Sequence, residues 1–415
     1  MFRSINIFEA RKEGYKTYRV PSIAVTKNDV VLVTAEARPD EGSDWDSNDV
    51  ILRRSLDAGE TFRNRQIVAN HSDFGKGPIS NFVLIPDLTT GKIIAVFCWK
   101  YSRVFRMFSE NDGETFSEPE EITSTFEQFL KDYNWRVCAT GPGHGIQLQS
   151  GRMIIPVWLS DGTGNEMGEG NLGHRPSVVS SIHSDDCGIS WERGEIICRH
   201  GDDINGETLI NPSETIAVQQ NNGTILFNIR SESLIDRRMI AHSPDGATNW
   251  NIQGFDDALL EPVCMASILK SNYNNEQNLK EILFVNPDNL ENDLIPTGRN
   301  LRHDRKRLTV KVSNDDCISW PLQKIIEAGP SGYSDIAQLS TGEFLCVYEC
   351  GIVERICDDK YIRVTKFDKK SNDLEHSSQS EGESNQEHRV IHKKNDKLHI
   401  YVRQDKYKGE LKSKN

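Results

Sequence analysis

One eight-residue pattern recurs five times along this chain of 415 residues and constrains its fold more than any other feature. The pattern is Ser-x-Asp-x-Gly-x-Thr followed by an aromatic residue. It occurs as SLDAGETF at 55–62, SENDGETF at 109–116 and SDDCGISW at 184–191, and more loosely as SPDGATNW at 243–250 and SNDDCISW at 313–320. An Asp-x-Gly segment forms a tight turn, because Asp caps backbone N–H groups and Gly adopts positive φ. Each copy therefore predicts a hairpin.

The segments around these turns alternate apolar and polar residues over short lengths, which is typical of β-strands. The clearest runs are Ser22–Thr34, Gly91–Phe97, Arg152–Trp158, Thr224–Ile229 and Glu343–Tyr348. Helical periodicity is scarce, and a single short helix is expected near Ser124–Asp132. The five copies are about 54 to 75 residues apart. This spacing fits four-stranded blades repeated around an axis, which predicts an all-β fold.

The composition changes at about Lys369. Residues 369–388, KKSNDLEHSSQSEGESNQEH, are polar and almost free of apolar side chains, which predicts disorder because such a segment cannot bury enough apolar surface. Within the remainder, Lys397–Val402 could form one strand. We therefore expect two parts, a β domain over residues 1–368 and a largely disordered tail over residues 369–415.

Charge and motif content exclude several functional classes. The net charge of −13 argues against general nucleic-acid binding, which needs a basic surface. No HxxxH, HExxH, GxGxxG or GxxxxGK[ST] pattern occurs, so neither a metal site nor another cofactor is expected. No apolar run reaches about 18 residues, so no membrane span is expected.

The cysteines and the N-terminus predict a cytoplasmic location. The nine cysteines are an odd number without a CxxC pair, which favours reduced, buried thiols over disulfides. Residues Met1–Tyr15 are mixed and charged, and they lack the apolar core of a signal peptide. A mature secreted form whose signal peptide had been removed would look the same.

The segment 18–62 resembles the opening of sialidases (neuraminidases) of the bacterial and animal type. It carries YRVP at 18–21 in place of the [FY]RIP box, then EAR at 36–38, an acidic loop, and a strand ending in RRS at 53–55. Four later segments resemble the same family in the same order: ATGPGHGIQL at 139–148, NPSETIAV with NGTILFNIRSES within 211–233, RKRLTVKVSNDDCISW at 305–320, and GYSDIAQLSTGEFLCVYE at 332–349. The resemblance covers about residues 15–367.

This resemblance implies a fold and an activity. The fold is a six-bladed β-propeller of four-stranded antiparallel blades. The activity is that of an exo-α-sialidase, a glycoside hydrolase that releases terminal sialic acids from oligosaccharides, glycoproteins or glycolipids. The reaction retains the anomeric configuration through a tyrosyl-linked intermediate.

The resemblance also implies an arginine clamp for the carboxylate of the sugar. A sialic acid carries this carboxylate on its anomeric carbon, and planar, permanently charged guanidinium groups bind it in a bidentate manner. The matching residues are Arg19 of YRVP, Arg230 of FNIRS and Arg305 of RKRLTV. Arg305 stands three residues before a Leu-Thr strand, as in the family, although Arg299, Arg302 and Arg307 lie nearby. Glu349 matches the acid that holds Arg19 in the empty site.

Tyr333 matches the nucleophile of the family, with Glu214 as its base. A phenol whose pKa is near ~10 is a poor nucleophile at neutral pH, so it needs a partner that accepts its proton. A neutral attacking group suits this reaction, because the reacting carbon lies beside a carboxylate that would repel an anion.

The acid/base residue is expected in the loop DEGSDWDSNDV at 40–50. The family places it five residues before the Asp that opens the next strand, which is Asp49 here. This spacing implies Asp44, with Asp46 as the alternative. Arg38 and Asn81 match further polar contacts to the sugar, and Ile79 or Phe82 could form an apolar wall for the N-acyl group.

Other functions share parts of this pattern. A trans-sialidase or an intramolecular trans-sialidase would use the same clamp and the same Tyr–Glu pair, and would differ in its product. A non-catalytic glycan-binding propeller would lack Asp44, Glu214 or Tyr333, whereas all three are present. A propeller glycosidase for another sugar would not need three arginines. The sequence leaves open the linkage, the N-acyl preference, the oligomeric state and the role of the tail.

Overall fold

The structure is a computed structural model, and it describes residues 2–40, 42–164, 172–274, 279–292, 302–354, 358–368, 375–376, 389–394 and 397–402. The chain forms two units, Met1–Glu375 and His376–Asn415. In the second unit, β30 (Arg389–Lys394) pairs antiparallel with β31 (Lys397–Val402), which confirms the strand expected there. The predicted disorder concerns residues 369–388, and apart from the short strand β29 (Glu375–His376) these lie outside the described residues.

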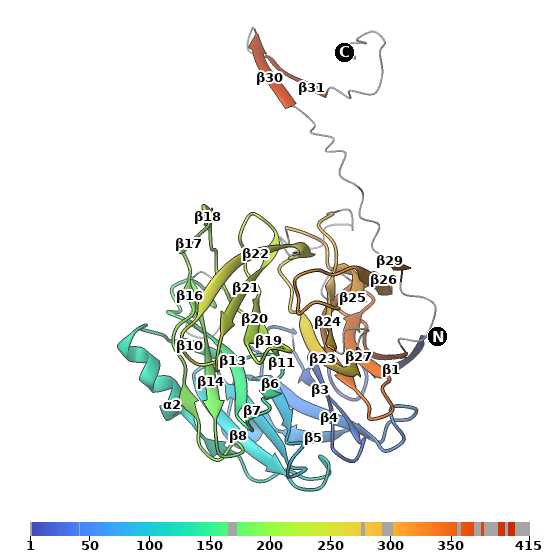
Figure 1. Cartoon of the computed structure of the whole chain (residues 1–415). Helices are drawn as coiled ribbons and strands as arrows, with labels where there is room; N and C mark the ends of the chain where they lie inside the picture. Colours follow the sequence, from blue (N-terminus) through green and yellow to red (C-terminus); the bar gives the residue numbers. More distant parts are fainter. Residues whose placement is uncertain are drawn as a thin grey trace. The chain divides into compact units, whose positions relative to one another are not determined.

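The first unit is all-β, as predicted, and its strands form successive antiparallel sheets (Figure 1). The first sheet contains β2 (Thr17–Val25), β3 (Val31–Arg38), β4 (Asp49–Ser55) and β5 (Gln66–Ala69). The second contains β6 (Ile79–Pro86), β7 (Ile93–Trp99), β8 (Arg103–Ser109) and β9 (Glu120–Glu121), with β11 (Gly143–His144) parallel to β6.

The third sheet contains β10 (Val137–Thr140), β12 (Ile146–Gln147), β13 (Met153–Ser160), β14 (Ser177–Ser184), β15 (Glu192–Arg193) and β16 (Cys198–Arg199). The fourth contains β19 (Thr215–Gln219), β20 (Ile225–Ile229), β21 (Arg237–Ser243) and β22 (Asn251–Leu260). A small ribbon of β17 (Asp203–Ile204) and β18 (Glu207–Thr208) lies between them in sequence.

The last sheet contains β23 (Ser267–Asn274), β24 (Lys280–Pro287), β25 (Lys306–Ser313), β26 (Leu322–Gln338), β27 (Phe344–Cys350), β28 (Tyr361–Phe367) and β1 (Arg3–Glu9). Its long strand β26 pairs with β25 over Leu322–Pro330 and with β27 over Ser331–Gln338. The sheet therefore consists of two antiparallel halves that share one strand. The N-terminal strand β1 closes the second half by pairing with β28.

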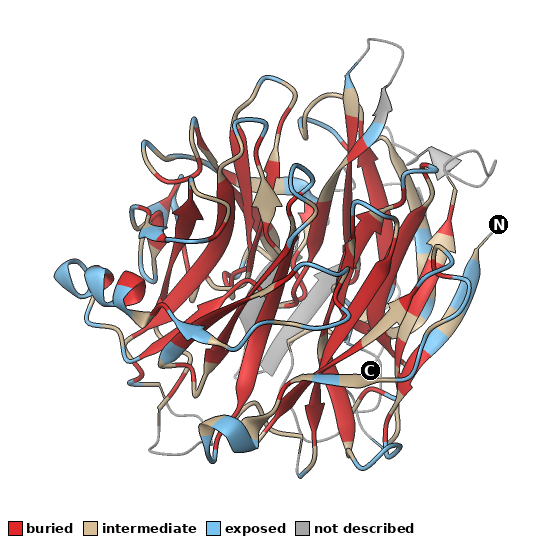
Figure 2. Cartoon of the chain, turned by 90° about the horizontal axis from the view of Figure 1, so that it is seen from below, coloured by how far each residue is buried: buried red, intermediate tan, exposed pale blue. Residues whose placement is uncertain are grey.

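Helices are few among the described residues, as expected. α1 (His71–Phe74) has four residues, and α2 (Thr123–Glu127) continues into the 3-10 turn η1 (Gln128–Lys131) where a helix was predicted. None of the described helices is long and apolar enough to span a bilayer. Figure 2 shows that the strands are mostly buried, while exposed residues gather in the connections and on α2.

The five repeated turns form the hairpins that the sequence predicts. In each, the first Ser bonds to the side chain two residues later, as Ser55 does to Asp57 at 2.7 Å, and the same pair recurs as Ser109–Asn111, Ser184–Asp186, Ser243–Asp245 and Ser313–Asp315. The Asp or Asn side chain then accepts the N–H of the Thr or Ser that follows, for example Thr61 at 2.8 Å. These bonds span at most five residues, so a local sequence suffices to specify them.

The glycines of these turns connect neighbouring sheets. A Cβ at Gly113 would lie 2.8 Å from Leu32 of the first sheet, and one at Gly188 would lie 2.9 Å from Ile94 of the second. Gly246 contacts Ile154 of the third sheet in the same way, and Gly59 of the first sheet contacts Leu345 of the last. In these four cases the turn packs against the preceding sheet, and for the first sheet that neighbour is the last sheet.

Residues from β2, β6, β12, β19, β23 and β26 line a central cavity of about 1400 Å³. Representative residues, one from each of these strands, are Ile23, Ile85, Ile146, Ala217, Ile268 and Ile336. One strand from each of the first four sheets, and β23 and β26 from the last sheet, therefore face a common cavity. Eight of the nine cysteines are described; all eight are free thiols, and six of them are buried, which agrees with the prediction of reduced thiols. Cys357 lies outside the described residues.

Candidate active site

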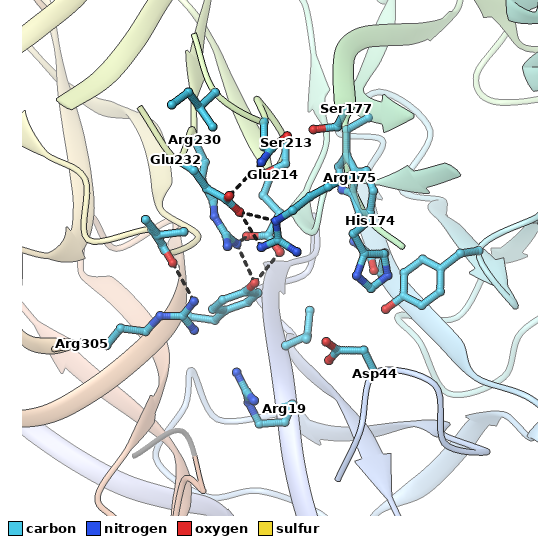
Figure 3. A pocket seen from close by; sticks show the side chains of 18 of the residues that line it. Arg19, Asp44, His174, Arg175, Ser177, Ser213, Glu214, Arg230, Glu232 and Arg305 are labelled. Carbon is cyan, nitrogen blue, oxygen red and sulfur yellow. Dashed lines mark hydrogen bonds and ion pairs between the residues drawn. The ribbon is translucent and has the colours of Figure 1, made fainter. Parts of the chain in front are cut away.

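A second cavity, of about 530 Å³, gathers nearly all of the predicted site residues. The predicted residues that line it are Arg19, Arg38, Asp44, Asn81, Glu214, Arg230, Arg305 and Tyr333. Glu349 does not line the cavity and lies buried directly behind it. Figure 3 shows the labelled side chains of Arg19, Arg230 and Arg305 reaching the same space from different sheets.

The three arginines surround one tyrosine. The guanidinium carbons of Arg19, Arg230 and Arg305 lie 5.7, 6.0 and 5.2 Å from the centre of the Tyr333 ring. Arg19 lies in β2, Arg230 follows β20, and Arg305 precedes β25, so residues far apart in the chain meet here. All four residues are at most 9% exposed. The arrangement presents a buried, cationic surface of the kind that binds a planar anion.

Tyr333 hydrogen bonds to both of its neighbours. Its hydroxyl donates to Glu214 Oε1 and accepts from Arg230 Nη1 at 2.8 Å, while Arg230 also pairs with Glu214. Burial raises the pKa of Tyr333; Arg230 opposes this rise and Glu214 adds to it. The phenol is therefore neutral at pH 7, and its proton already points at a carboxylate. Such a phenol can attack only as its proton moves to Glu214.

Glu349 holds the two strands that carry Arg19 and Tyr333. Its carboxylate accepts Arg19 Nε at 2.7 Å, the N–H of Val20 at 2.9 Å and the N–H of Tyr333 at 3.0 Å. Gly332 permits this approach, because a Cβ at that position would collide with the carboxylate. Burial alone would raise the pKa of Glu349, but Arg19 and these N–H groups hold it below its ordinary value. Asp359 Oδ2 lies 3.2 Å from Arg19 Nε as a further counter-charge.

We expect Glu349→Gln to lower the free energy of unfolding by about 3 kcal/mol at pH 7, because it removes the main counter-charge of buried Arg19. The pKa of Glu349 is lower in the folded state, so its contribution is complete above the ordinary Glu pKa and is lost as pH falls through the folded value. The difference between wild type and variant should therefore shrink on acidification. Urea unfolding from pH 7 to pH 3 measures it. A difference that does not change with pH would contradict the assignment of this carboxylate as ionised.

Shifts in the register of strand pairing orient the side chains of several site residues toward the cavity. The pairing of β2 with β3 shifts between Arg19 and Ser22, that of β6 with β7 between Ser80 and Val83, and that of β26 with β27 between Ser331 and Ser334. A bulge redirects the side chains beside it. Val20 and Asn81 adopt positive φ angles of 50° and 54° at these points. Such angles are unusual for any residue other than glycine, and they are most strained for a β-branched residue such as valine.

Arg38 hydrogen bonds to both Asp44 and the buried acid Glu36. Its Nη1 donates to Asp44 Oδ1 at 2.6 Å and its Nη2 to Glu36 Oε2 at 2.5 Å. Burial raises the pKa of Glu36, and Arg38 opposes that rise. The Asp44 side chain is 42% exposed, whereas Arg38 and Glu36 are each 1% exposed. The alternative acid, Asp46, instead accepts the N–H groups of Gly42 and Ser43 and so shapes the loop that carries Asp44.

The structure also separates the candidates for the third arginine. Arg305 lies over the Tyr333 ring and donates to the carbonyl of Val263 at 2.6 Å. Arg302 lines the outer part of the cavity but donates to Ser233 and pairs with Asp236. Arg307 is exposed and Arg299 lies outside the described residues. The motif already singles out Arg305 among these residues, because it stands three residues before the Leu-Thr strand.

Asn81 lines the cavity, but its Nδ2 donates to the carbonyl of Thr140 at 2.9 Å. The apolar wall differs from the expectation. Ile79 and Phe82 are buried in the core between the first two sheets and do not line the cavity, because these positions face the sheet interior. Tyr101 and Trp158 line it instead.

The sequence reasoning also missed a polar rim. Arg175 pairs with Glu232, and Asn211 Nδ2 donates to Glu232 Oε2 at 2.8 Å; all three line the cavity, beside His174. Glu232 belongs to the same FNIRSES segment as Arg230, which was the only signal for it. Within the described residues, no group of three or more His, Cys, Asp or Glu side chains has the geometry of a metal site.

Comparisons of the sequence and of the structure with known proteins give consistent results. The sequence matches the BNR repeat-like domain family over residues 31–346. It is 24% identical over 367 residues to a sialidase of Micromonospora viridifaciens, covering 82% of this chain and 51% of that protein. It is 24% identical over 396 residues to Sialidase-3 of Mus musculus, covering 84% and 91%. The structure is similar to that of the Hadza microbial sialidase Hz136, with a TM-score of 0.70 at 21% identity, covering 88% and 68%. The chain thus spans about half the length of the Micromonospora relative.

Proposed function

The chain belongs to the BNR repeat-like domain family, and on that premise we propose that it is an exo-α-sialidase that hydrolyses terminal sialic acids from glycoconjugates. The catalytic unit comprises residues 1–368, with 369–415 as a tail outside it. The fold is a six-bladed β-propeller, in which the two halves of the last sheet are separate blades that share β26. The six strands that line the central cavity and the turn contacts between neighbouring sheets support this count.

One observation carries the proposed activity. Three guanidinium groups lie within 6.0 Å of the ring of a buried tyrosine whose hydroxyl donates to a carboxylate. A monosaccharide with an anionic group on its anomeric carbon fits this arrangement, because the clamp would hold the carboxylate while the phenol faces the reacting carbon. A neutral sugar would offer these three guanidinium groups no anion to bind.

The reaction proceeds in two displacements. Tyr333 attacks the anomeric carbon as the bond to the leaving oxygen breaks; Glu214 accepts the phenol proton, and Asp44 donates a proton to the leaving oxygen. Water then attacks the same carbon after losing a proton to Asp44, while the bond to Tyr333 breaks and Glu214 returns the proton to the phenol. Two inversions give net retention. Arg19, Arg230 and Arg305 bind the carboxylate in both steps, and Arg38 and Asn81 face the ring substituents.

Asp44→Ala should slow natural substrates much more than activated ones. A sugar leaving group needs its proton, whereas a fluorogenic aryloxide leaves without one. We therefore expect kcat/KM, which reports only the steps through the first displacement, to fall by about 10²–10³-fold on sialyl-lactose and by less than about 10-fold on an aryl sialoside. Asp46→Ala is the matched control, because Asp46 lies in the same loop but bonds to its backbone. Equal losses on both substrates would contradict the role of Asp44.

Transfer chemistry remains the second candidate, because a trans-sialidase or an intramolecular trans-sialidase would use the same residues. Product analysis distinguishes the three reactions. Hydrolysis gives free sialic acid, transfer gives a new sialoside when lactose is added, and intramolecular attack gives an anhydro sugar. We expect free sialic acid.

A further inference from the structure

An aromatic cluster connects the loop of Asp44 to two other sheets. We call residues 42–48 the acid loop. Trp45, the neighbour of Asp44, stacks on His174 with ring centres 5.2 Å apart and planes 9° from parallel. Trp45 also contacts Tyr101 at 5.1 Å, and Tyr101 and Trp158 contact His174 at 4.7 and 5.4 Å. In Figure 3, His174 lies between Arg175 and Asp44.

The members of this cluster come from three different sheets. The acid loop joins β3 to β4, Tyr101 lies between β7 and β8, and His174 precedes β14. Within the loop, hydrogen bonds are local: Asp46 accepts two N–H groups of the loop, and the N–H of Trp45 donates to Ser43 Oγ at 3.1 Å. These bonds shape the middle of the loop. Its last two residues are attached to the second sheet, because the N–H of Gly77 donates to Ser47 Oγ at 3.2 Å and the N–H of Ile79 to the carbonyl of Asn48 at 3.1 Å. The side chain of Trp45 packs against the large core cluster of the second and third sheets.

Asp44 itself is not fixed by burial, because 42% of its side chain is exposed. Arg38 holds one carboxylate oxygen, but it does so from the same sheet and so cannot set the distance from Asp44 to the other sheets. The stack of Trp45 on His174 therefore joins the residue beside Asp44 to the segment that enters the third sheet.

We propose that Trp45 and His174 are positioning residues, which together hold the acid loop so that Asp44 faces the leaving-group oxygen. The proposal rests on the proposed function and adds two residues to it. Neither side chain takes part in proton transfer to the substrate. Their effect is indirect: a displacement of a catalytic group by about 1 Å can cost about 10²-fold in rate.

The test uses His174→Ala, Trp45→Ala and His174→Phe with the full-length chain. Each is assayed on sialyl-lactose, whose sugar leaving group needs Asp44, and on an aryl sialoside, whose leaving group does not. We expect the two alanine variants to lose at least about 10-fold more in kcat/KM on sialyl-lactose than on the aryl sialoside. His174→Phe keeps a flat ring against Trp45 and should restore the sialyl-lactose rate to within about three-fold of wild type.

A double-variant cycle tests whether the two residues act as one unit. Trp45→Ala/His174→Ala should be no slower on sialyl-lactose than the slower single variant, because either substitution already breaks the stack. The proposal would be overturned if the rate losses of the two single variants multiplied in the double variant. Equal losses on both substrates, or a His174→Phe variant as slow as His174→Ala, would also overturn it.

Trp320→Ala is the control for general loss of stability. Trp320 packs on Phe284 at 5.7 Å, is 6% exposed and does not line the cavity. It should lower the melting temperature without changing the ratio of the two rates. A failure of the proposed function can be distinguished from a failure of this proposal, because in the first case the wild type would hydrolyse neither substrate.

Discussion

Tyr333→Phe should abolish turnover while leaving the cavity intact. We expect kcat on a fluorogenic α-sialoside to fall by at least about 10³-fold, because the variant removes the only oxygen that could form the covalent bond while Glu214 and the clamp remain. Phenylalanine preserves the ring over which the three guanidinium groups lie. The wild type and the variant are compared in steady-state assays at pH 7, with the melting temperature of each recorded.

The variant also separates catalysis from binding. The clamp does not need the phenol oxygen to bind a carboxylate, so free sialic acid should bind to Tyr333→Phe with an affinity within about 10-fold of that for wild type, measured by calorimetry. Tyr348→Phe is the matched control. Tyr348 is fully buried in the neighbouring strand β27, where its hydroxyl bonds to Thr365 Oγ1 at 2.9 Å, and it does not line the cavity. A kcat of Tyr333→Phe within 10-fold of the wild-type value would contradict the assignment of Tyr333 as the nucleophile.

Arg230→Lys should produce the second largest loss. Arg230 lines the cavity, donates to the Tyr333 hydroxyl at 2.8 Å and pairs with Glu214. A lysine keeps the charge but loses the planar fork that holds a carboxylate in a bidentate manner. We expect kcat/KM to fall by about 10²–10³-fold, which corresponds to about 3–4 kcal/mol of lost transition-state stabilisation.

The split between KM and kcat is the informative part of this experiment. Arg230 contacts both the carboxylate space and the nucleophile, so KM should rise and kcat should fall together. A pure KM effect would mean that Arg230 binds substrate without orienting Tyr333. Arg237→Lys is the control: Arg237 lies in β21 of the same sheet, donates to the backbone carbonyl of Asp257 at 2.9 Å and does not line the cavity. Its kcat/KM should stay within about two-fold of wild type.

Local chemistry explains which parts of the fold were predictable. The repeated turns depend on Ser and Asp side chains that bond to groups at most five residues away, so their pattern alone located five hairpins. Alternating apolar residues located strands such as β13, β20 and β27 for the same reason. The segment Ser22–Thr34 was read as one run, but a turn divides it into the end of β2 and the start of β3.

The candidate site was predictable only where a residue stands in a distinctive motif. Arg19, Glu214, Arg230 and Tyr333 were found in this way, whereas Ile79 and Phe82 were wrongly expected to line the apolar wall. The alternation of apolar and polar residues along β6 does not show which residues face the cavity, because the bulge between Ser80 and Val83 changes the direction of the side chains there. His174 and Trp45 carry no motif, and their contact joins residues 129 positions apart.

The sequence by itself determined an all-β chain of repeated hairpins and named most of the charged groups of the site, because those signals lie within a few residues of one another. Only the tertiary structure decided that Tyr101 and Trp158, and not Ile79 or Phe82, line the cavity, and that Glu349 binds both Arg19 and the N–H of Tyr333. The reason is distance along the chain: these contacts span up to 330 residues, and each depends on strand register and bulges set by the packing of whole sheets.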